Sequence, residues 1–267
     1  MTARQLSTLM VEKVWGRDVL PAPFAAPPGI RIGEIWFEPP PELPQVLVKY
    51  LFTSEKLSVQ VHPSAAAALP GEAGKEECWL VLDAEEGAEL AIGFARDVTR
   101  EEIAAAAVDG SIESLLAWHP AQAGDLFYLP AGTVHAIGPG LALVEVQQTS
   151  DTTFRLYDYG RPRELHLERA LDVARGSAYP SENKGSIAKG PVLVDGPHFR
   201  LDRIEGAPDA ATAAAWHGAL LALPLAGEVA AKDGSARAAA GECLVADGLD
   251  SLDFSGAQVT LLARAAV

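Results

Sequence analysis

Short runs of apolar residues, separated by glycine and proline, recur along the whole chain. This spacing is typical of an all-β sandwich or barrel. Within 57–62 apolar and polar residues alternate, so Ser58, Gln60 and His62 share one face of the predicted strand. A polar strand face of this kind predicts that the strand lines a cavity. In the first 160 residues the runs predict strands at 30–37, 46–52, 57–62, 77–83, 89–93, 125–129, 142–148 and 153–159.

Two segments have helical patterns. Thr99 and Glu102 form a capping box, which predicts a small helical insertion over 98–118. A second helical run covers 165–174 and follows the strand predicted at 153–159.

The amino-acid composition of the chain changes after residue 175. The segment 176–190 is rich in glycine, serine, proline and lysine and is predicted to be a linker. The sequence of segment 241–248 is similar to that of 124–130, because each has a glycine and an acidic residue before an apolar run. This similarity suggests a degenerate second copy of one β unit. Further strands are predicted at 198–204, 219–225, 242–245 and 259–263. We therefore expect a first domain over 1–175, a linker over 176–190 and a smaller β domain over 191–267.

Composition and charge narrow the function classes. The 267 residues are 49% hydrophobic and 21% charged, as in an ordinary globular protein, and no apolar run approaches the roughly 18–20 residues of a membrane span. The two cysteines lie far apart and the N-terminus has no signal pattern, so we expect a cytoplasmic protein. The net charge of −15 argues against nucleic-acid or membrane partners.

One histidine lies in a motif with a physical meaning. Gly124, Pro130, Gly132 and His135 follow the spacing G-x5-P-x-G-x2-H, in which a turn enters a strand and a tight turn delivers the histidine. This resembles the second cupin motif, whose histidine binds a metal inside a small barrel. The alternative is an ordinary hairpin with an unrelated histidine.

Three further residues complete a candidate metal site. Gln60 and His62 are two positions apart on one strand and can reach the same ion. Glu77 begins a later apolar run and offers a carboxylate oxygen. Together with His135 they form a mixed nitrogen and oxygen set without thiolate, which suits zinc in an open catalytic site, and iron or manganese less well.

Four segments occur together in one order: LSVQVHP at 57–63, GKEECW at 74–79, PAGTVHAIG at 130–138 and QTSDTTFRLYDYGR at 148–161. With them, about residues 10–175 resemble the type I mannose-6-phosphate isomerases, zinc-dependent enzymes of the cupin superfamily. The resemblance implies a cupin jelly-roll barrel followed by a smaller, degenerate jelly-roll-like domain. Beyond residue 190 only the likeness of fold remains.

The resemblance also implies roles for individual residues. It makes Gln60, His62, Glu77 and His135 the ligands of one zinc ion per chain, the same four that the spacing indicates. It implies that further polar side chains face the cavity: Lys49, Lys75, Asp151 and Arg155.

One motif departs from the family pattern. Short members usually have Lys-Thr-Glu where this chain has Lys75-Glu76-Glu77. Alternation alone does not choose the ligand, because Glu76 and Glu77 point in opposite directions. The register of the resemblance favours Glu77.

The implied reaction interconverts mannose 6-phosphate and fructose 6-phosphate through a cis-enediol. Arg155 is expected to stabilise the developing oxyanion, while Lys75, Asp151 or Glu77 moves the carbon-bound proton. The phosphate is expected to meet cations and a hydroxyl among Lys49, Ser58, Arg155 and Arg163. The expected partner is a phosphorylated hexose, and the protein is expected to be a monomer or a homodimer.

Two other function classes stay open. One is a different metal-dependent cupin enzyme, although Gln60 stands where iron cupins usually present a histidine. The other is a non-catalytic sugar-phosphate binder that retains the fold.

Overall fold

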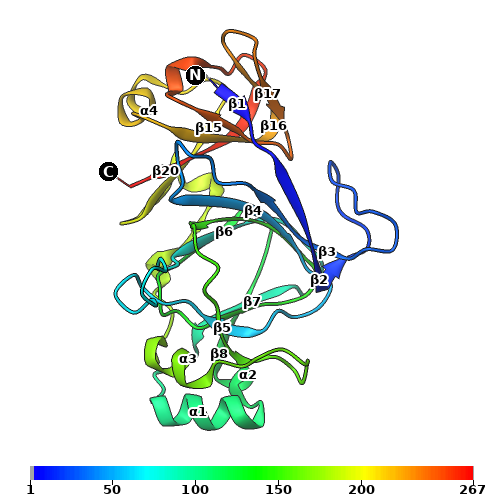
Figure 1. Cartoon of the computed structure of the whole chain (residues 1–267), viewed down its shortest axis with the longest axis vertical. Coiled ribbons are helices and arrows are strands. Elements are labelled where there is room, and N and C mark those ends of the chain that lie inside the picture. The colour runs from blue at the N-terminus through cyan, green and yellow to red at the C-terminus, as the bar shows by residue number, and fades with distance from the viewer. Residues whose placement is uncertain (1–2, 267) are drawn as a thin grey trace.

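Three antiparallel sheets form the framework of the chain, which a computed structural model describes over residues 3–266. Figure 1 shows them as layers, with the C-terminal sheet above, a seven-stranded sheet in the middle, a five-stranded sheet below and helices underneath. The prediction of a mainly β chain with a small helical insertion is therefore confirmed.

The two sheets of the N-terminal part face each other across one cavity. The seven-stranded sheet has the order β13 (Lys184–Ser186), β9 (Asp125–Leu129), β6 (Glu77–Ala84), β11 (Leu141–Gln148), β4 (Val46–Phe52), β3 (Ile32–Phe37) and β2 (Thr8–Arg17). The five-stranded sheet has the order β12 (Phe154–Tyr157), β5 (Val59–Val61), β10 (His135–Ile137), β7 (Glu89–Phe94) and β8 (Leu116–Pro120).

All eight strands predicted in this part are present, and four further strands of these two sheets lie outside the predicted strand ranges: β2, β8, β10 and β13. The helical insertion ends earlier than residue 118, because α1 (Arg100–Asp109) and α2 (Ile112–Leu115) are followed by β8, which pairs with β7. Strand β2 was not predicted, because half of its residues are exposed and its apolar side chains do not alternate with polar ones.

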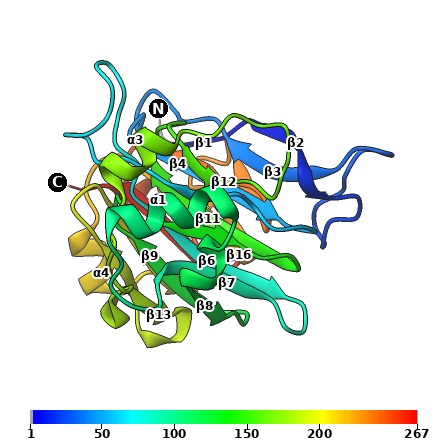
Figure 2. The same ribbon diagram turned by 90° about the horizontal axis from the view of Figure 1, so that it is seen from below.

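The helices cover the outer face of the five-stranded sheet, as seen from below in Figure 2. Thr99 and Glu102 form the predicted capping box at the start of α1, and Gly110 ends this helix with a φ of 82°. The second helix, α3 (Leu167–Val173), packs beside it. Ile103 of α1 and Ala170 of α3 join the apolar outer side of β5 in one buried cluster.

The C-terminal part is a third sheet with β1 (Ala3–Gln5) at its edge. Its order is β1, β18 (Leu244–Ala246), β16 (Leu220–Ala231), β20 (Ala257–Ala265), β15 (Phe199–Glu205) and β14 (Val192–Asp195), with β17 (Arg237–Ala239) and β19 (Leu252–Asp253) beside β16. The remaining helical elements are α4 (Ala210–Ala215), η1 (Ser181–Asn183), η2 (Ile187–Lys189) and η3 (Leu249–Ser251). The four strands predicted for this part are all present.

The two parts are joined closely. Phe199 and Leu221 of the C-terminal sheet share a buried cluster with Tyr50 and Phe52 of the seven-stranded sheet. The segment 176–190 contributes β13, which pairs with β9. The division at 1–175, 176–190 and 191–267 stays a prediction, with residues 1–2 and 267 outside the described range.

No helix in residues 3–266 is both long and apolar enough to cross a membrane.

Candidate metal centre

One row of polar side chains crosses the inner face of the five-stranded sheet. Gln60 of β5 is directly opposite Arg155 of β12 on one side and His135 of β10 on the other. Directly opposed residues of an antiparallel sheet point to the same face. His62 follows β5 two positions after Gln60. The strand register thus brings four predicted site residues to one face.

A second row crosses the facing side of the seven-stranded sheet. Glu145 of β11 is opposite Lys49 of β4 and Trp79 of β6. Glu77 lies two positions before Trp79 on β6, so it shares this inner face. The two rows face each other across the cavity, and both contribute to its lining.

Three of the predicted metal ligands come together. One ligand atom each of His62, Glu77 and His135 lies within 4.8 Å of the others, and all three residues are buried. Nε2 of His62 is 3.5 Å from Oε2 of Glu77, and Nε2 of His135 is 3.4 Å from Oε1. Ligand atoms about 2.1 Å from one ion are separated by roughly these distances. The three residues could therefore hold a metal ion.

The surroundings of these side chains fit a cation. Nδ1 of His62 is 2.9 Å from the carbonyl oxygen of Thr152, and Nδ1 of His135 is 2.9 Å from that of Thr133. Each carbonyl oxygen accepts a hydrogen bond from the Nδ1–H of its ring, which leaves the Nε2 lone pair of each histidine for binding a metal. Neither buried carboxylate oxygen of Glu77 accepts a well-directed hydrogen bond.

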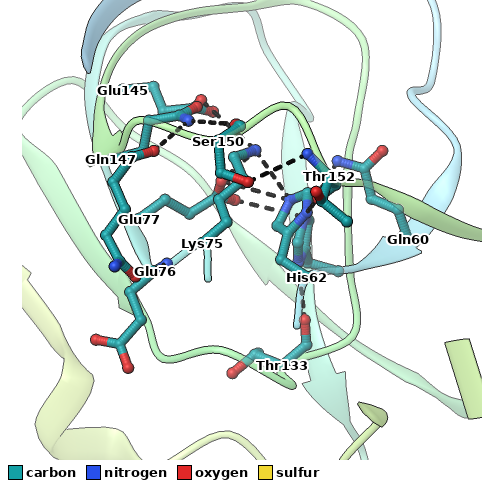
Figure 3. A network of polar contacts seen from close by, with 12 residues as sticks. Gln60, His62, Lys75, Glu76, Glu77, Thr133, Glu145, Gln147, Ser150 and Thr152 are labelled. Carbon is teal, nitrogen blue, oxygen red and sulfur yellow. Dashed lines mark hydrogen bonds and ion pairs between the residues drawn. The ribbon is translucent and has the colours of Figure 1, made fainter. Parts of the chain in front are cut away.

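The ammonium of Lys75 already lies against this group. Its Nζ is 2.8 Å from Oε2 of Glu77 and 3.0 Å from Nε2 of His62, contacts drawn in Figure 3. A positive charge is therefore accommodated beside two of the three candidate ligand atoms.

Gln60 reaches the same place with its amide. Its Nε2 is 3.2 Å from Nε2 of His135, while its Oε1 accepts a hydrogen bond of 3.1 Å from the hydroxyl of Ser58. Only an amide oxygen can bind a metal, so ligation by Gln60 requires the amide to turn over. Ser58 can then accept the amide hydrogen instead. The role of Gln60 as a ligand stays a prediction.

A tight turn places His135. Gly132 has a φ of 87°, and a Cβ there would meet the carbonyl oxygen of Val173 at 2.8 Å, so a side chain does not fit. The backbone nitrogen of Gly132 donates to the carbonyl oxygen of His62, which ties the two candidate ligands together. These contacts explain the spacing of glycine and histidine in the motif.

The side chains of the two neighbouring glutamates point in different directions. Glu77 belongs to the buried group with both histidines. The side chain of Glu76 points away from His62, as Figure 3 shows, and its carboxylate accepts a hydrogen bond from the hydroxyl of Tyr128.

Burial and charge set the protonation of the site. Burial lowers the pKa of His62 well below its usual value, with the Lys75 ammonium adding to the effect, and burial also lowers the pKa of His135. Burial opposes the charged form of Lys75, but the carboxylates of Glu77 and Glu145 outweigh it and raise the pKa of this lysine. Neutral histidines suit metal binding, and Lys75 carries its proton in this arrangement.

The cavity beside the histidines has a volume of about 400 Å³, which is in the range of small-molecule sites. Apart from Glu77, which belongs to the buried group beside the cavity, every residue predicted for catalysis or for phosphate binding lines it: Lys49, Ser58, Lys75, Asp151, Arg155 and Arg163. Asp151 lies at the exposed rim, whereas Lys49 and Lys75 are buried.

The arginines near the cavity differ in how many of their hydrogen-bond donors are already paired. Nε of Arg155 is buried without a hydrogen-bond partner. Arg163 is held by two hydrogen bonds of 2.6 Å to the carboxylate of Asp158. Arg161 is paired with Glu55 and Asp158 and does not line the cavity. Arg155 therefore has the most donor capacity left for an anion.

Sequence reasoning missed Glu145. This buried carboxylate lies 3.1 Å from Nζ of Lys49 and 4.0 Å from Nζ of Lys75, and it accepts a hydrogen bond from the indole of Trp79. A charged residue within the apolar run 141–148 was the available signal. Burial of a carboxylate is costly without a cation, so Glu145 indicated that a lysine or arginine faces the same strand.

The fold and the buried His-Glu-His group define a cupin-type protein with a candidate metal centre. A mannose-6-phosphate isomerase from Streptococcus mutans is 42% identical over 168 residues, which cover 58% of this chain and 53% of the relative. Mannose-6-phosphate isomerase ManA from Bacillus subtilis is 42% identical over 147 residues, covering 52% of this chain and 46% of the relative. The chain thus spans about half the length of the curated relatives it matches.

Solved structures extend the likeness to the whole fold. The crystal structure of the mannose 6-phosphate isomerase from Bacillus subtilis superposes with a TM-score of 0.80 and 25% identity, covering 99% of this chain and 100% of that chain. A variant of phosphomannose isomerase from Salmonella typhimurium gives a TM-score of 0.72 at 15% identity, covering 100% of both chains, and supports the fold alone. No family model matches the chain. The predicted resemblance to mannose-6-phosphate isomerases is confirmed.

Proposed function

We propose that the chain is a zinc-dependent aldose–ketose isomerase that interconverts D-mannose 6-phosphate and D-fructose 6-phosphate. One observation carries the proposal: the buried group of His62, Glu77 and His135 contacts Lys75 and Gln60. Both of these side chains line a cavity that also presents further lysine and arginine side chains. The names of the curated relatives support the same substrate pair.

Zinc is the proposed metal, at one ion per chain. His62, Glu77 and His135 would hold it, with Gln60 as the proposed fourth ligand after its amide turns. Imidazole and carboxylate ligands without thiolate suit zinc in a site that keeps positions open. When bound, the ion would polarise the sugar oxygens as a Lewis acid and stabilise the negative charge of a cis-enediolate.

Positively charged side chains in the cavity can bind the phosphate group of the proposed substrate. The chain carries a net charge of −15 and repels anions at long range. Local cations must therefore hold the phosphate, and we assign this to Arg155, Arg163 and Lys49 with the hydroxyl of Ser58. Arg155 also offers its unpartnered Nε to a developing oxyanion.

Two kinds of proton carrier line the cavity. Lys75, whose pKa is raised by Glu77 and Glu145, enters as a proton donor to a sugar oxygen. The carbon-bound proton then needs a carboxylate, and three carboxylates line the cavity: Asp151 at the rim, and Glu145 and Glu34 on the inner face. Glu34 is already paired with Lys13 and accepts a hydrogen bond from the indole of Trp36, so Asp151 and Glu145 are tested first. Exchange of the C2 proton with deuterium from solvent in Asp151→Asn and Glu145→Gln identifies the base, since loss of the base abolishes exchange.

An isomerase assay tests the function directly. Purified protein is given mannose 6-phosphate as isolated, after chelation and after addition of zinc, and formation of fructose 6-phosphate is followed. We expect turnover that chelation removes and zinc restores. Tight binding of zinc without turnover would contradict the isomerase and support the non-catalytic sugar-phosphate binder. Turnover of a different phosphorylated sugar would support another metal-dependent cupin enzyme.

We propose a cytoplasmic protein, either a monomer or a homodimer, that acts on a free phosphorylated hexose.

A further inference from the structure

The segment 75–77, which leads into β6 and carries Lys75 and Glu77, contacts the C-terminal part through its middle residue, Glu76. Glu76 lies between these two site residues, and its carboxylate faces away from the cavity (Figure 3). The hydroxyl of Tyr128 on β9 donates to Oε2 of Glu76, and Nε2 of His198 is 3.8 Å from Oε1. Glu76 is also the position where this chain departs from the Lys-Thr-Glu of similar short isomerases.

Tyr128 is itself held by the turn between β14 and β15. Its ring packs edge-on against Phe199 with 6.1 Å between centroids. A Cβ on Gly196 would lie 3.0 Å from the Tyr128 hydroxyl, so the turn approaches this oxygen closely. His198 comes from the same turn. The C-terminal part therefore contacts Glu76 directly through His198 and indirectly through Tyr128.

The backbone of Glu76 is tied to β11 as well. Its amide donates to Oε1 of Gln148 at 2.9 Å, and its carbonyl oxygen accepts from the amide of Gln148 at 3.0 Å. The backbone contacts fix one side of the segment, and the side-chain contacts with Tyr128 and His198 fix the opposite side. Lys75 and Glu77 on either side of Glu76 are restrained as a result.

From these contacts we propose that Glu76, Tyr128 and His198 are positioning residues through which the C-terminal part orients Glu77 and Lys75 in the candidate metal centre. The inference rests on the proposed metal site. It gives the C-terminal sheet a role in the site although that sheet contributes no ligand. Residues that orient metal ligands from behind typically change metal affinity by about 10–100-fold when they are replaced.

Tyr128→Phe removes the hydroxyl that Glu76 accepts from and leaves the ring packing on Phe199. Tyr179→Phe is the matched control, because the hydroxyl of Tyr179 donates to the carbonyl oxygens of Tyr128 and Asn183 and does not touch Glu76. Glu76→Ala removes both side-chain contacts, whereas Glu76→Gln keeps an acceptor for Tyr128 and serves as the conservative rescue.

Two readouts on the full chain decide the proposal. Amide hydrogen exchange of residues 75–77 is measured in the metal-free protein, and zinc affinity is measured by competition with a chelator. We expect Tyr128→Phe and Glu76→Ala to speed exchange and weaken zinc binding, each by about tenfold. Tyr179→Phe and Glu76→Gln should stay within about twofold of the parent.

A lower melting temperature in Tyr128→Phe with unchanged exchange at 75–77 and unchanged zinc affinity would overturn the proposal, because the contact would then be merely structural. Failure of the isomerase function is a separate outcome, recognised by a parent protein without turnover. If the parent also binds no zinc, the exchange measurement alone decides whether Tyr128 positions the segment.

Discussion

The N-terminal and C-terminal parts use similar β units for different purposes. Gly124 and Gly241 both adopt positive φ, at 90° and 91°, shortly before β9 and β18. In the N-terminal part the facing sheets present charged and polar side chains to a cavity. In the C-terminal part the equivalent interior is filled by apolar residues such as Leu220, Leu244 and Leu262.

A larger hollow in the C-terminal part makes the contrast sharper. It measures about 720 Å³ and is lined by Trp216, His217 and Phe254, among others. Yet the only group of metal-ligating side chains found in residues 3–266 is the His-Glu-His group of the N-terminal part. Convergent polar groups, rather than the size of a hollow, mark the candidate site.

The largest effect is expected from removing the C-terminal part. A chain that ends at Gly190 would expose Tyr50, Phe52 and Cys78, which now pack against the C-terminal sheet. Because exposing such a buried cluster removes a large part of the hydrophobic stabilisation, we expect insoluble or unfolded protein. Solubility and circular dichroism provide the measurement. A truncated chain that stays soluble and fully active would show that the two parts are independent.

The next effect concerns one histidine from each part. His135→Ala removes a candidate ligand, so we expect loss of bound zinc and a fall in isomerase activity of about 1,000-fold. His217→Ala removes an exposed histidine of the C-terminal hollow, and we expect activity within about twofold of the parent. Metal content and initial rates are compared. Equal losses in the two variants would contradict the division of roles.

A smaller effect is expected from the buried ion pair of the N-terminal part. Lys49→Met leaves the carboxylate of Glu145 buried with Trp79 and the more distant Lys75, and should destabilise the fold by about 3 kcal/mol. Urea unfolding gives the measurement. The control is Lys56→Met, which breaks a more exposed pair with Glu113 and should cost about 1 kcal/mol or less. Similar losses of stability in the two variants would mean that burial does not make the Lys49–Glu145 pair more costly to break.

The smallest effect is a pH dependence of the metal-free protein. The pKa of His62 is lowered in the folded state, so the unfolded chain binds more protons between that lowered value and about 6.5. Stability is therefore fully present above about pH 7 and falls by up to about 1.4 kcal/mol per pH unit below 6.5. His62→Gln should flatten the slope measured between pH 7.5 and 5.5. A parent protein whose stability does not change over this range would refute the assignment. The lowered pKa of Glu77 acts only at more acidic pH.

Local motifs made the strands and the candidate ligands predictable. His62 and His135 stand in motifs whose strand and turn geometry can be derived from spacing, and the structure places them together with Glu77. The pairing of Lys49 with Glu145 could not be derived, because it depends on the register of strands that are far apart in the sequence. Register is set by packing of the whole sheet.

Two strands and the contacts of Glu76 were also not predicted, because each depends on packing between distant segments or has no regular apolar pattern. β2 has little buried surface, so its apolar pattern is irregular. Residues 116–118 belong to the predicted helical insertion, but pairing with β7 makes 116–120 a strand. The contact of Glu76 with Tyr128 and His198 joins three segments that are distant in the sequence, so no local sequence pattern predicts it.

We propose that the inner faces of the N-terminal sheets hold one zinc ion between His62, Glu77 and His135. A crystal structure of the zinc-loaded protein, with anomalous scattering recorded at the zinc edge, tests it most directly. We predict a single strong peak per chain, about 2.0–2.2 Å from Nε2 of both histidines and from a carboxylate oxygen of Glu77. A peak elsewhere, or no peak at full zinc saturation, would contradict the claim.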